Sequence, residues 1–188
     1  HDNSTVIHNG ADIFLIDKIE PLDNKIINEY ENVWSCAASW RPHKRLKENV
    51  QYFLEHRSDK ECLVIAGIPD YHIKDPSIFY VGDIPYDRLL SLYKRSKYFL
   101  HLAWLDHCPN VVVDARACGC QIICSSAGGT VEIAGPNSVV INENEWDFKP
   151  TRLYDPPVMD FSKKGKNNFD TCYDMNKVAK KYADFMKK

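Results

Sequence analysis

Between residues 33 and 141 the sequence alternates short apolar runs with longer amphipathic segments. This alternation is typical of βαβ units, in which each buried strand of a parallel sheet is followed by a helix that covers one face of the sheet. The pattern predicts strands at 33–39, 62–67, 78–82, 98–103, 121–124 and 139–141, with helices at 46–56 and 86–96. The sequence therefore predicts an α/β fold with a Rossmann-like, doubly wound parallel sheet of about six strands.

Composition narrows the possible partners of such a domain. The chain has 188 residues, of which 44% are hydrophobic and 27% charged, so it can enclose a core and is not a disordered chain. Its net charge of −2 provides no broad basic surface, so nucleic acid is not an expected partner. No apolar run approaches the ~20 residues that a membrane-spanning helix needs. We expect membrane association only through a part of the protein outside this chain.

The seven cysteines are odd in number and scattered through apolar segments. This distribution differs from the dense, even framework of a small secreted domain, so it indicates reduced thiols and a cytoplasmic location. Four of them cluster at positions 108, 118, 120 and 124, but they contain no CxxC pair. We therefore expect small buried apolar side chains there and no metal site.

The last part of the chain differs from the sheet region in composition. Residues 142–172 are rich in Asn, Asp, Lys and Pro, which predicts a surface excursion. Residues 173–188 form a C-terminal helix in this interpretation, and the helix packs its apolar face onto the domain while lysines face solvent. That face comprises Met175, Val178, Ala179, Tyr182, Phe185 and Met186. The whole chain, 1–188, is thus interpreted as one domain with its core sheet in 5–141.

Ligands of doubly wound sheets bind beyond the carboxyl ends of the strands, in the loops that lead into helices. Three such loops are unusual, and the first, 40–47, carries a cluster of cations where a helix begins. The cluster consists of Arg41, His43, Lys44, Arg45 and Lys47. The helix dipole disfavours cations at this end, so a bound polyanion would explain them. The alternative is a solvated basic turn.

The second loop, 104–110, leads from Asp106 into a segment that ends at Gly119. Its valines favour a strand, but Pro109 is suited to a first helical turn and Gly119 to a helix end, so we expect a helix over 109–118. On that helix Asp114 projects from the early turns toward the space that Asp106 also faces. The third loop, 125–130, contains Gly128 and Gly129, which allow either a close approach to a ligand or a plain tight turn.

Taken in order, these segments resemble the C-terminal, donor-binding half of retaining GT-B glycosyltransferases of the family 4 type, the group 1 glycosyltransferases. The resemblance covers residues 5–141. Its most specific part is the stretch HLAWLDHCPNVVVDARACGCQIICSSAGGTVEIAG over 101–135, which is similar to the family's E-x₇-E region and its later A-x-G and G-G-T-x-E segments. The acidic pair is Asp106 and Asp114, so the spacing is kept while both side chains are shortened.

Two further segments resemble the family. The sequence RPHKRL over 41–46 is similar to the basic turn that grips the donor diphosphate. Lys44 matches the lysine of that turn, whereas the usual arginine position falls near Ser39, so Arg41 is a displaced substitute. Residues 6–12, VIHNGAD, resemble the V-I-P-N-G-V-D segment that leads from the acceptor-binding into the donor-binding domain. This resemblance implies that the acceptor domain precedes residue 1 and is absent from this chain.

The resemblance implies roles for individual residues. Asp106 would contact hydroxyls of the donor sugar, and it forms the catalytic group together with Lys44 and Arg41, which stabilise the leaving diphosphate. Asp114 would bind the ribose hydroxyls, and the nucleobase would lie against the loop at 82–85, recognised mainly by backbone. The donor-binding residues are thus expected to be Asp114, His107, Cys108, Pro109, Asn110, Gly82, Ile84, Gly128 and Gly129.

The resemblance implies transfer of a sugar, with retention, from a nucleoside-diphosphate sugar, and we expect the nucleotide to be UDP or GDP. The acceptor would be a glycan, lipid or protein bound by the missing domain, and neither a cofactor nor a metal is required. Shortening Glu to Asp withdraws the carboxylate by about one carbon–carbon bond, which is more than the ~0.5 Å tolerance of a catalytic site. Either the backbone lies further inward, or the donor is unusual, or activity is reduced. We expect that this chain alone does not catalyse the sugar transfer.

Other functions are compatible with the same architecture. The chain could be a nucleotide-sugar epimerase or a phosphorylase, because a fold does not fix a function. It could also be a non-catalytic nucleotide- or protein-interaction domain in which the two aspartates record a decayed donor site. A plain α/β scaffold with polar loops is the third alternative.

Overall fold

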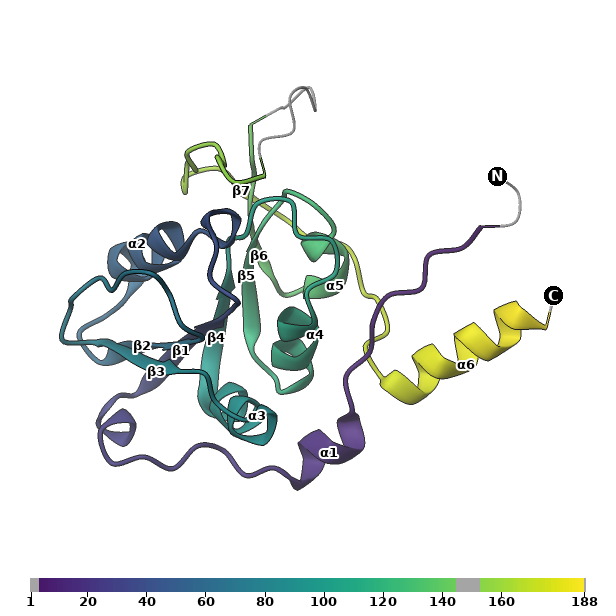
Figure 1. The fold of residues 1–188 in the computed structure, drawn as a ribbon, viewed down its shortest axis with the longest axis horizontal. Helices are drawn as coiled ribbons and strands as arrows, with labels where there is room; N and C mark the ends of the chain where they lie inside the picture. Colours follow the sequence, from purple (N-terminus) through teal and green to yellow (C-terminus); the bar gives the residue numbers. More distant parts are fainter. Residues whose placement is uncertain (1–3, 145–152, 188) are drawn as a thin grey trace.

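A seven-stranded sheet with the order β3-β2-β1-β4-β5-β6-β7 forms the centre of the computed structural model, which describes residues 4–144 and 153–187 (Figure 1). The strands are β1 Asn32–Ala37, β2 Glu61–Ala66, β3 Ile78–Gly82, β4 Ser96–His101, β5 Gln121–Ser125, β6 Val139–Ile141 and β7 Lys164–Gly165. Strands β1 to β6 pair in parallel, whereas β7 pairs antiparallel with β6. This confirms the predicted doubly wound sheet and adds one short edge strand that the sequence did not predict.

Helices lie on both faces of this sheet. They are α1 Ile13–Lys18, α2 Leu46–His56, α3 Tyr86–Arg95, α4 Asn110–Ala117, α5 Thr130–Ala134 and α6 Met175–Met186, with 3₁₀ turns η1 Ile27–Glu29 and η2 Pro42–Lys44. On one face, Val50 and Phe53 of α2 pack with Trp34 of β1. On the other face, α3, α4 and α5 pack against Phe99 and Ile122 (Figure 1). Because helices cover both faces, side chains on both sides of the central strands β1 and β2 are buried, and most of them are apolar.

The segment that follows the second loop is a helix, as its flanking residues predict. Pro109 takes the N-cap position with φ −69°, so the helix itself begins at Asn110. Gly119 ends it with φ +94°, a left-handed conformation that glycine adopts without strain. The strand-favouring Val112 and Val113 are fully buried against the sheet. Tertiary packing and the two end signals therefore outweigh the strand propensity of the valines.

The prediction that the C-terminal helix packs its apolar face onto the domain is wrong. Helix α6 forms where predicted, with the Asp174 side chain capping its first turn. Of its apolar residues only Val178 is buried, whereas Met175, Tyr182, Phe185 and Met186 are exposed. The helix projects away from the sheet beside the N-terminal segment (Figure 1). Helical periodicity identified an apolar face correctly but carries no information on what covers it.

The segment 142–172 is more than a surface excursion where the structure describes it; residues 145–152 lie outside the described residues. It supplies strand β7, and both Met159 and Phe161 pack against the cluster under α2. The backbone carbonyl of Pro157 accepts a hydrogen bond of 2.6 Å from Arg45. This part of the segment therefore covers the α2 side of the sheet.

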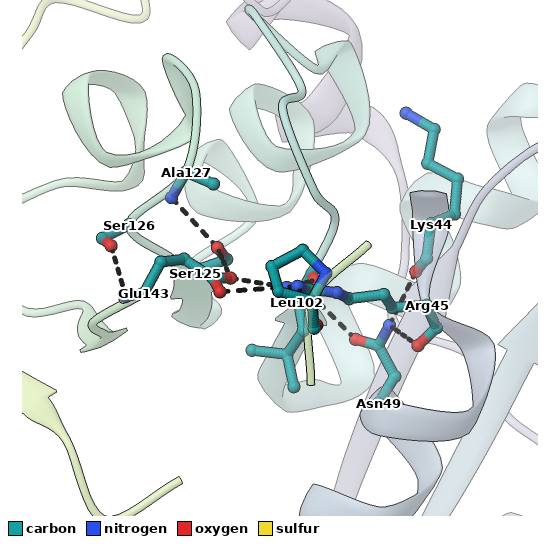
Figure 2. Close-up of polar contacts among 9 residues, drawn as sticks. Lys44, Arg45, Asn49, Leu102, Ser125, Ser126, Ala127 and Glu143 are labelled. Atoms are coloured by element: carbon teal, nitrogen blue, oxygen red, sulfur yellow. Dashed lines mark hydrogen bonds and ion pairs between the residues drawn. The ribbon is translucent and has the colours of Figure 1, made fainter. Parts of the chain in front are cut away.

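Arg45 lies in the loop before α2 with a left-handed backbone, φ +52°, and is buried (Figure 2). Its guanidinium forms an ion pair with Glu143 and donates to the carbonyl of Leu102 at 3.3 Å. Ser125 donates to the same carboxylate at 2.6 Å. The prediction that Arg45 belongs to a solvated or anion-binding cluster is therefore wrong, since its charge is already paired inside the protein.

We predict that Arg45→Met lowers the free energy of unfolding by about 3–5 kcal/mol, because it leaves the buried Glu143 carboxylate without a cation. The double substitution with Glu143→Leu should recover at least half of that loss. Lys60→Met serves as the control, because it removes an exposed ion pair with Glu31 and should change stability little. Urea denaturation measures all three; equal losses in the single and double variants would contradict the prediction.

Candidate functional site

The three loops singled out in the sequence meet at the carboxyl edge of the sheet. The amide of Trp104 donates to the carbonyl of His43 at 2.7 Å, which joins the second loop to the first. The amide of Gly129 donates to the carbonyl of Asp106 at 2.8 Å, which joins the third loop to the second. In parallel sheets this edge is the usual ligand site. The structure thus brings the cationic turn, the acidic loop and the glycine pair together.

Asp106 is the charged centre of this edge. Its Oδ2 atom forms an ion pair with Nζ of Lys44 and a hydrogen bond of 2.9 Å with Nε2 of His101. All three side chains are largely or fully buried, with exposed fractions of 19% for Lys44, 16% for Asp106 and 4% for His101. Two of the three predicted catalytic residues are therefore in direct contact.

The protonation states of this group follow from burial and from the contacts. Burial alone would raise the pKa of Asp106, but the hydrogen bonds from His101 and Lys44 outweigh it and hold that pKa well below its usual range. Burial lowers the pKa of His101, against the opposing influence of Asp106. At neutral pH the group therefore contains an ammonium, a carboxylate and a neutral imidazole, whose Nε2–H donates to Asp106.

The backbone around Asp106 is held in an unusual conformation. Leu105, the residue before it, has φ +54°, which is a sparsely populated region for a leucine. A Cβ atom on Gly128 would lie 2.2 Å from the carbonyl oxygen of Asp106, and one on Gly129 would lie 2.0 Å from that of His107. Both glycines are thus required for the close approach of the third loop to the second, rather than for a plain tight turn.

Asp114 lies apart from the Lys44 contact, in a second part of the site. It is buried on α4 and is hydrogen-bonded to Tyr86, the first residue of α3. Burial raises the pKa of Asp114 to about 6, although the hydrogen bond from Tyr86 lowers it. Tyr86 directly follows the loop 82–85, where the nucleobase is expected, so the predicted ribose and base contacts are neighbours.

The other predicted site residues differ in accessibility. Arg41, His107 and Asn110 are exposed, and Gly82 and Cys108 are partly exposed. The side chain of Ile84 is half-buried and packs against the core, so only its backbone remains for a ligand. The amide oxygen of Asn110 accepts a hydrogen bond of 2.7 Å from Asn9, which ties the N-terminal segment to this edge.

The sequence pattern predicts no role for His101 or Tyr86. His101 ends a buried strand five residues before Asp106, and Tyr86 begins a helix directly after the loop assigned to the base. A polar residue at the carboxyl end of a strand was the available signal for His101. Nothing in the spacing relates Tyr86 to Asp114, because they lie on different helices.

Among the residues that the structure describes, no three His, Cys, Asp or Glu side chains are grouped so that they could hold a metal ion. Within the same residues, no helix combines the length and apolarity needed to cross a membrane. The cysteines there are all free thiols, and burial raises the pKa of Cys124 to about 12.

We predict that Asp114→Asn gains stability relative to the wild type as pH rises from 4 to 8, by up to about 3 kcal/mol. The folded-state pKa of about 6 exceeds the ordinary value of 3.8, so the folded protein binds the proton more tightly than the unfolded chain does. Wild-type stability from this group is present below pH 4 and lost as pH rises through 6. A difference in unfolding free energy that does not change with pH would refute this.

We also predict that Gly128→Ala destabilises the fold by about 1–3 kcal/mol and displaces Asp106, because the new methyl group overlaps the Asp106 carbonyl. Gly119→Ala is the matched control, since that glycine also has positive φ but has open space around it. Thermal denaturation of both variants measures the difference. Equal losses would show that backbone strain alone, and not the contact with Asp106, is responsible.

Comparisons with known proteins agree with this architecture. Among solved structures, HepE from Anabaena, crystallised with UDP-glucose, superposes with a TM-score of 0.65 at 14% identity, over 97% of this chain and 57% of HepE. AviGT4, a glycosyltransferase of avilamycin A biosynthesis, gives 0.61 at 16% identity, over 100% of this chain and 59% of its own. Sucrose-phosphate synthase from Thermosynechococcus elongatus gives 0.59 at 16% identity, over 75% and 40%.

The chain spans less than two thirds of the length of each of these proteins. A comparison with curated protein sequences gave no significant match. The sheet described above is the Rossmann-like C-terminal half of a GT-B fold. The family model "Glycosyl transferases group 1" matches residues 25–148, which include all three loops. This chain therefore belongs to the group 1 glycosyltransferase family.

Proposed function

We propose that this chain is the donor-binding half of a retaining glycosyltransferase of the family 4 type, which transfers a sugar from a nucleoside-diphosphate sugar. The observation that carries the proposal is the contact between Lys44 and Asp106 at the carboxyl edge of the sheet. A cation for the diphosphate and a carboxylate for the sugar lie side by side there. HepE, which shares the fold, was crystallised with UDP-glucose, and this supports a nucleotide sugar as ligand.

In this mechanism Lys44 binds the diphosphate and stabilises the negative charge that develops on it as the bond to the sugar breaks. Stabilisation by a partly buried, preorganised cation is stronger than it would be in water. Exposed Arg41 adds positive charge to the same loop. We propose that no divalent metal is needed, because these cations take over the charge neutralisation.

Asp106 binds hydroxyls of the donor sugar through its carboxylate. Its Oδ1 atom accepts no hydrogen bond from the residues that the structure describes, so this oxygen is available to a ligand. The left-handed Leu105 and the close contact with Gly128 set the position of the Asp106 backbone. Of the three explanations for the short aspartate, we favour the one in which the backbone, rather than a longer side chain, brings the carboxylate to the sugar.

Asp114 binds the ribose hydroxyls, and the base lies against the loop 82–85. The hydrogen bond to Tyr86 fixes the Asp114 carboxylate next to that loop. Because its pKa is about 6, Asp114 is ionised at pH 7.5 and can accept two hydrogen bonds from vicinal hydroxyls. The phosphates then extend from Asp114 toward Lys44, with the glycine loop beside them.

We further propose that the acceptor binds to a part of the enzyme outside this chain, that the enzyme acts in the cytoplasm, and that the chain alone binds donor without transferring the sugar. The reduced state of the cysteines that the sequence indicates supports the cytoplasm. Multiple turnovers by the chain alone on an added acceptor would contradict the last of these proposals.

Calorimetry with UDP and GDP tests the donor site. We predict millimolar or tighter binding of one of them, weakened roughly 10- to 150-fold by Lys44→Ala and by Asp114→Ala, as expected for losing a charged hydrogen-bond partner. Lys97→Ala is the matched control: it removes the same charge from β4, at the end opposite to the loop that carries Asp106, and should bind as the wild type does. Binding of neither nucleotide would favour the non-catalytic interaction domain.

A further inference from the structure

Asp106 has two cationic or potentially cationic partners on a single oxygen atom. Lys44 and His101 both contact Oδ2, from the loop before α2 and from the end of β4. Because the Lys44 ammonium already compensates the charge of the Asp106 carboxylate, the carboxylate does not require a protonated imidazole as its second partner. Burial lowers the pKa of His101 and the charge of Lys44 lowers it further, so the imidazole is neutral while Lys44 stays in contact with Asp106.

Donor binding would change the pairing of Asp106 with Lys44 and His101. This inference rests on the proposed function, in which Lys44 binds the diphosphate. The diphosphate and the Asp106 carboxylate compete for the same ammonium group, since Lys44 is the cation expected to hold the phosphates. When Lys44 moves toward the diphosphate, Asp106 keeps its charge but loses its cation. A partly buried carboxylate that has lost a cation strongly favours protonation of a neighbouring base.

We propose that His101 is a positioning residue for Asp106: it takes up a proton when the donor draws Lys44 away, so that an imidazolium replaces the ammonium as the partner of the carboxylate. The proton comes from solvent and binds Nδ1, because Nε2 already carries the hydrogen that is donated to Asp106. Asp106 thereby stays ionised and oriented toward the sugar while Lys44 serves the phosphates.

The groups that face His101 determine whether its pKa rises or falls when Lys44 leaves Asp106. Asp106, from the loop after β4, raises its pKa, whereas Lys44, from the loop before α2, lowers it. His43, on the same loop as Lys44, also senses the charge of His101, and its own pKa is lowered first by burial and then by Lys44. On the side of β4, His101 stacks on the uncharged ring of Phe99. Removing Lys44 from the group therefore shifts the balance toward Asp106.

The first test uses the free protein and requires no ligand. Lys44→Met imitates the departure of the ammonium, so the pKa of His101 should rise in this variant when the imidazole is titrated by NMR. His101→Gln assigns the signal among the seven histidines. Lys47→Met is the matched control, since it removes an exposed cation from the next turn and should leave the His101 titration almost unchanged. An unchanged or lowered pKa in Lys44→Met overturns the inference.

The second test measures proton uptake on donor binding. UDP-glucose is suitable because its diphosphate has no group that titrates near neutral pH, and at pH 7.5 Asp114 is already ionised. Calorimetry in buffers of different ionisation enthalpy should show uptake of a fraction of a proton, up to about one, for each donor bound. His101→Gln keeps an N–H for Asp106 but cannot titrate, so it should retain binding within a few fold and lose the uptake.

The two tests separate the inference from the proposed function. A binding enthalpy that is independent of buffer, or an equal uptake in His101→Gln, overturns the inference while leaving the donor site intact. Absence of binding for UDP-glucose and for both UDP and GDP overturns the proposed function and, with it, the role of His101 in donor binding. In that case the NMR titration still decides whether Lys44 controls the protonation of His101.

Discussion

The buried ion pair between Arg45 and Glu143 holds the functional edge of the sheet together. Arg45 comes from the loop before α2, Glu143 from the segment after β6, and the same carboxylate receives a hydrogen bond from Ser125 at the end of β5. Three loops that are far apart in sequence are thus connected through one carboxylate (Figure 2). Either charge alone is costly inside a protein, so a buried pair of this kind disfavours arrangements in which the two residues are separated. Here it fixes the turn that carries Lys44.

The neighbouring cations Lys44 and Arg45 point in different directions. Arg45 points inward and its charge is paired with Glu143 inside the protein, whereas Lys44, one residue earlier, contacts Asp106 at the edge of the sheet. The left-handed backbone of Arg45 lies between the 3₁₀ turn and α2 and sends the two side chains in different directions. The cost of this backbone conformation is offset by the contacts that the guanidinium makes with Glu143 and with two carbonyl groups. Adjacent residues of one short loop therefore serve the fold, through Arg45, and the proposed donor site, through Lys44.

The site has two parts with different electrostatics. Around Asp106, contacts with Lys44 and His101 keep a carboxylate ionised in a largely buried place. Around Asp114, burial outweighs the hydrogen bond from Tyr86 and raises the pKa to about 6, so the carboxylate becomes neutral at mildly acidic pH. This difference matches what the two parts are proposed to bind. The charged group around Asp106 would bind next to the anionic diphosphate, and Asp114 would bind the uncharged hydroxyls of the ribose. It also means that acidification protonates Asp114, and so weakens the proposed ribose contact, before it protonates Asp106.

The sequence alone determined the doubly wound sheet, its six parallel strands and the three loops that follow strands at one edge of it. Strand and helix periodicity are local properties, and parallel strands place all such loops at the same edge. It also identified Lys44, Asp106 and the glycine pair through a family resemblance. Only the tertiary structure decided which of these side chains touch, that His101 and Tyr86 hold the two aspartates, that Arg45 is buried, and that the apolar face of α6 is exposed. Each of these features depends on contacts between residues that are far apart in the sequence, and a local sequence pattern contains no information about such contacts.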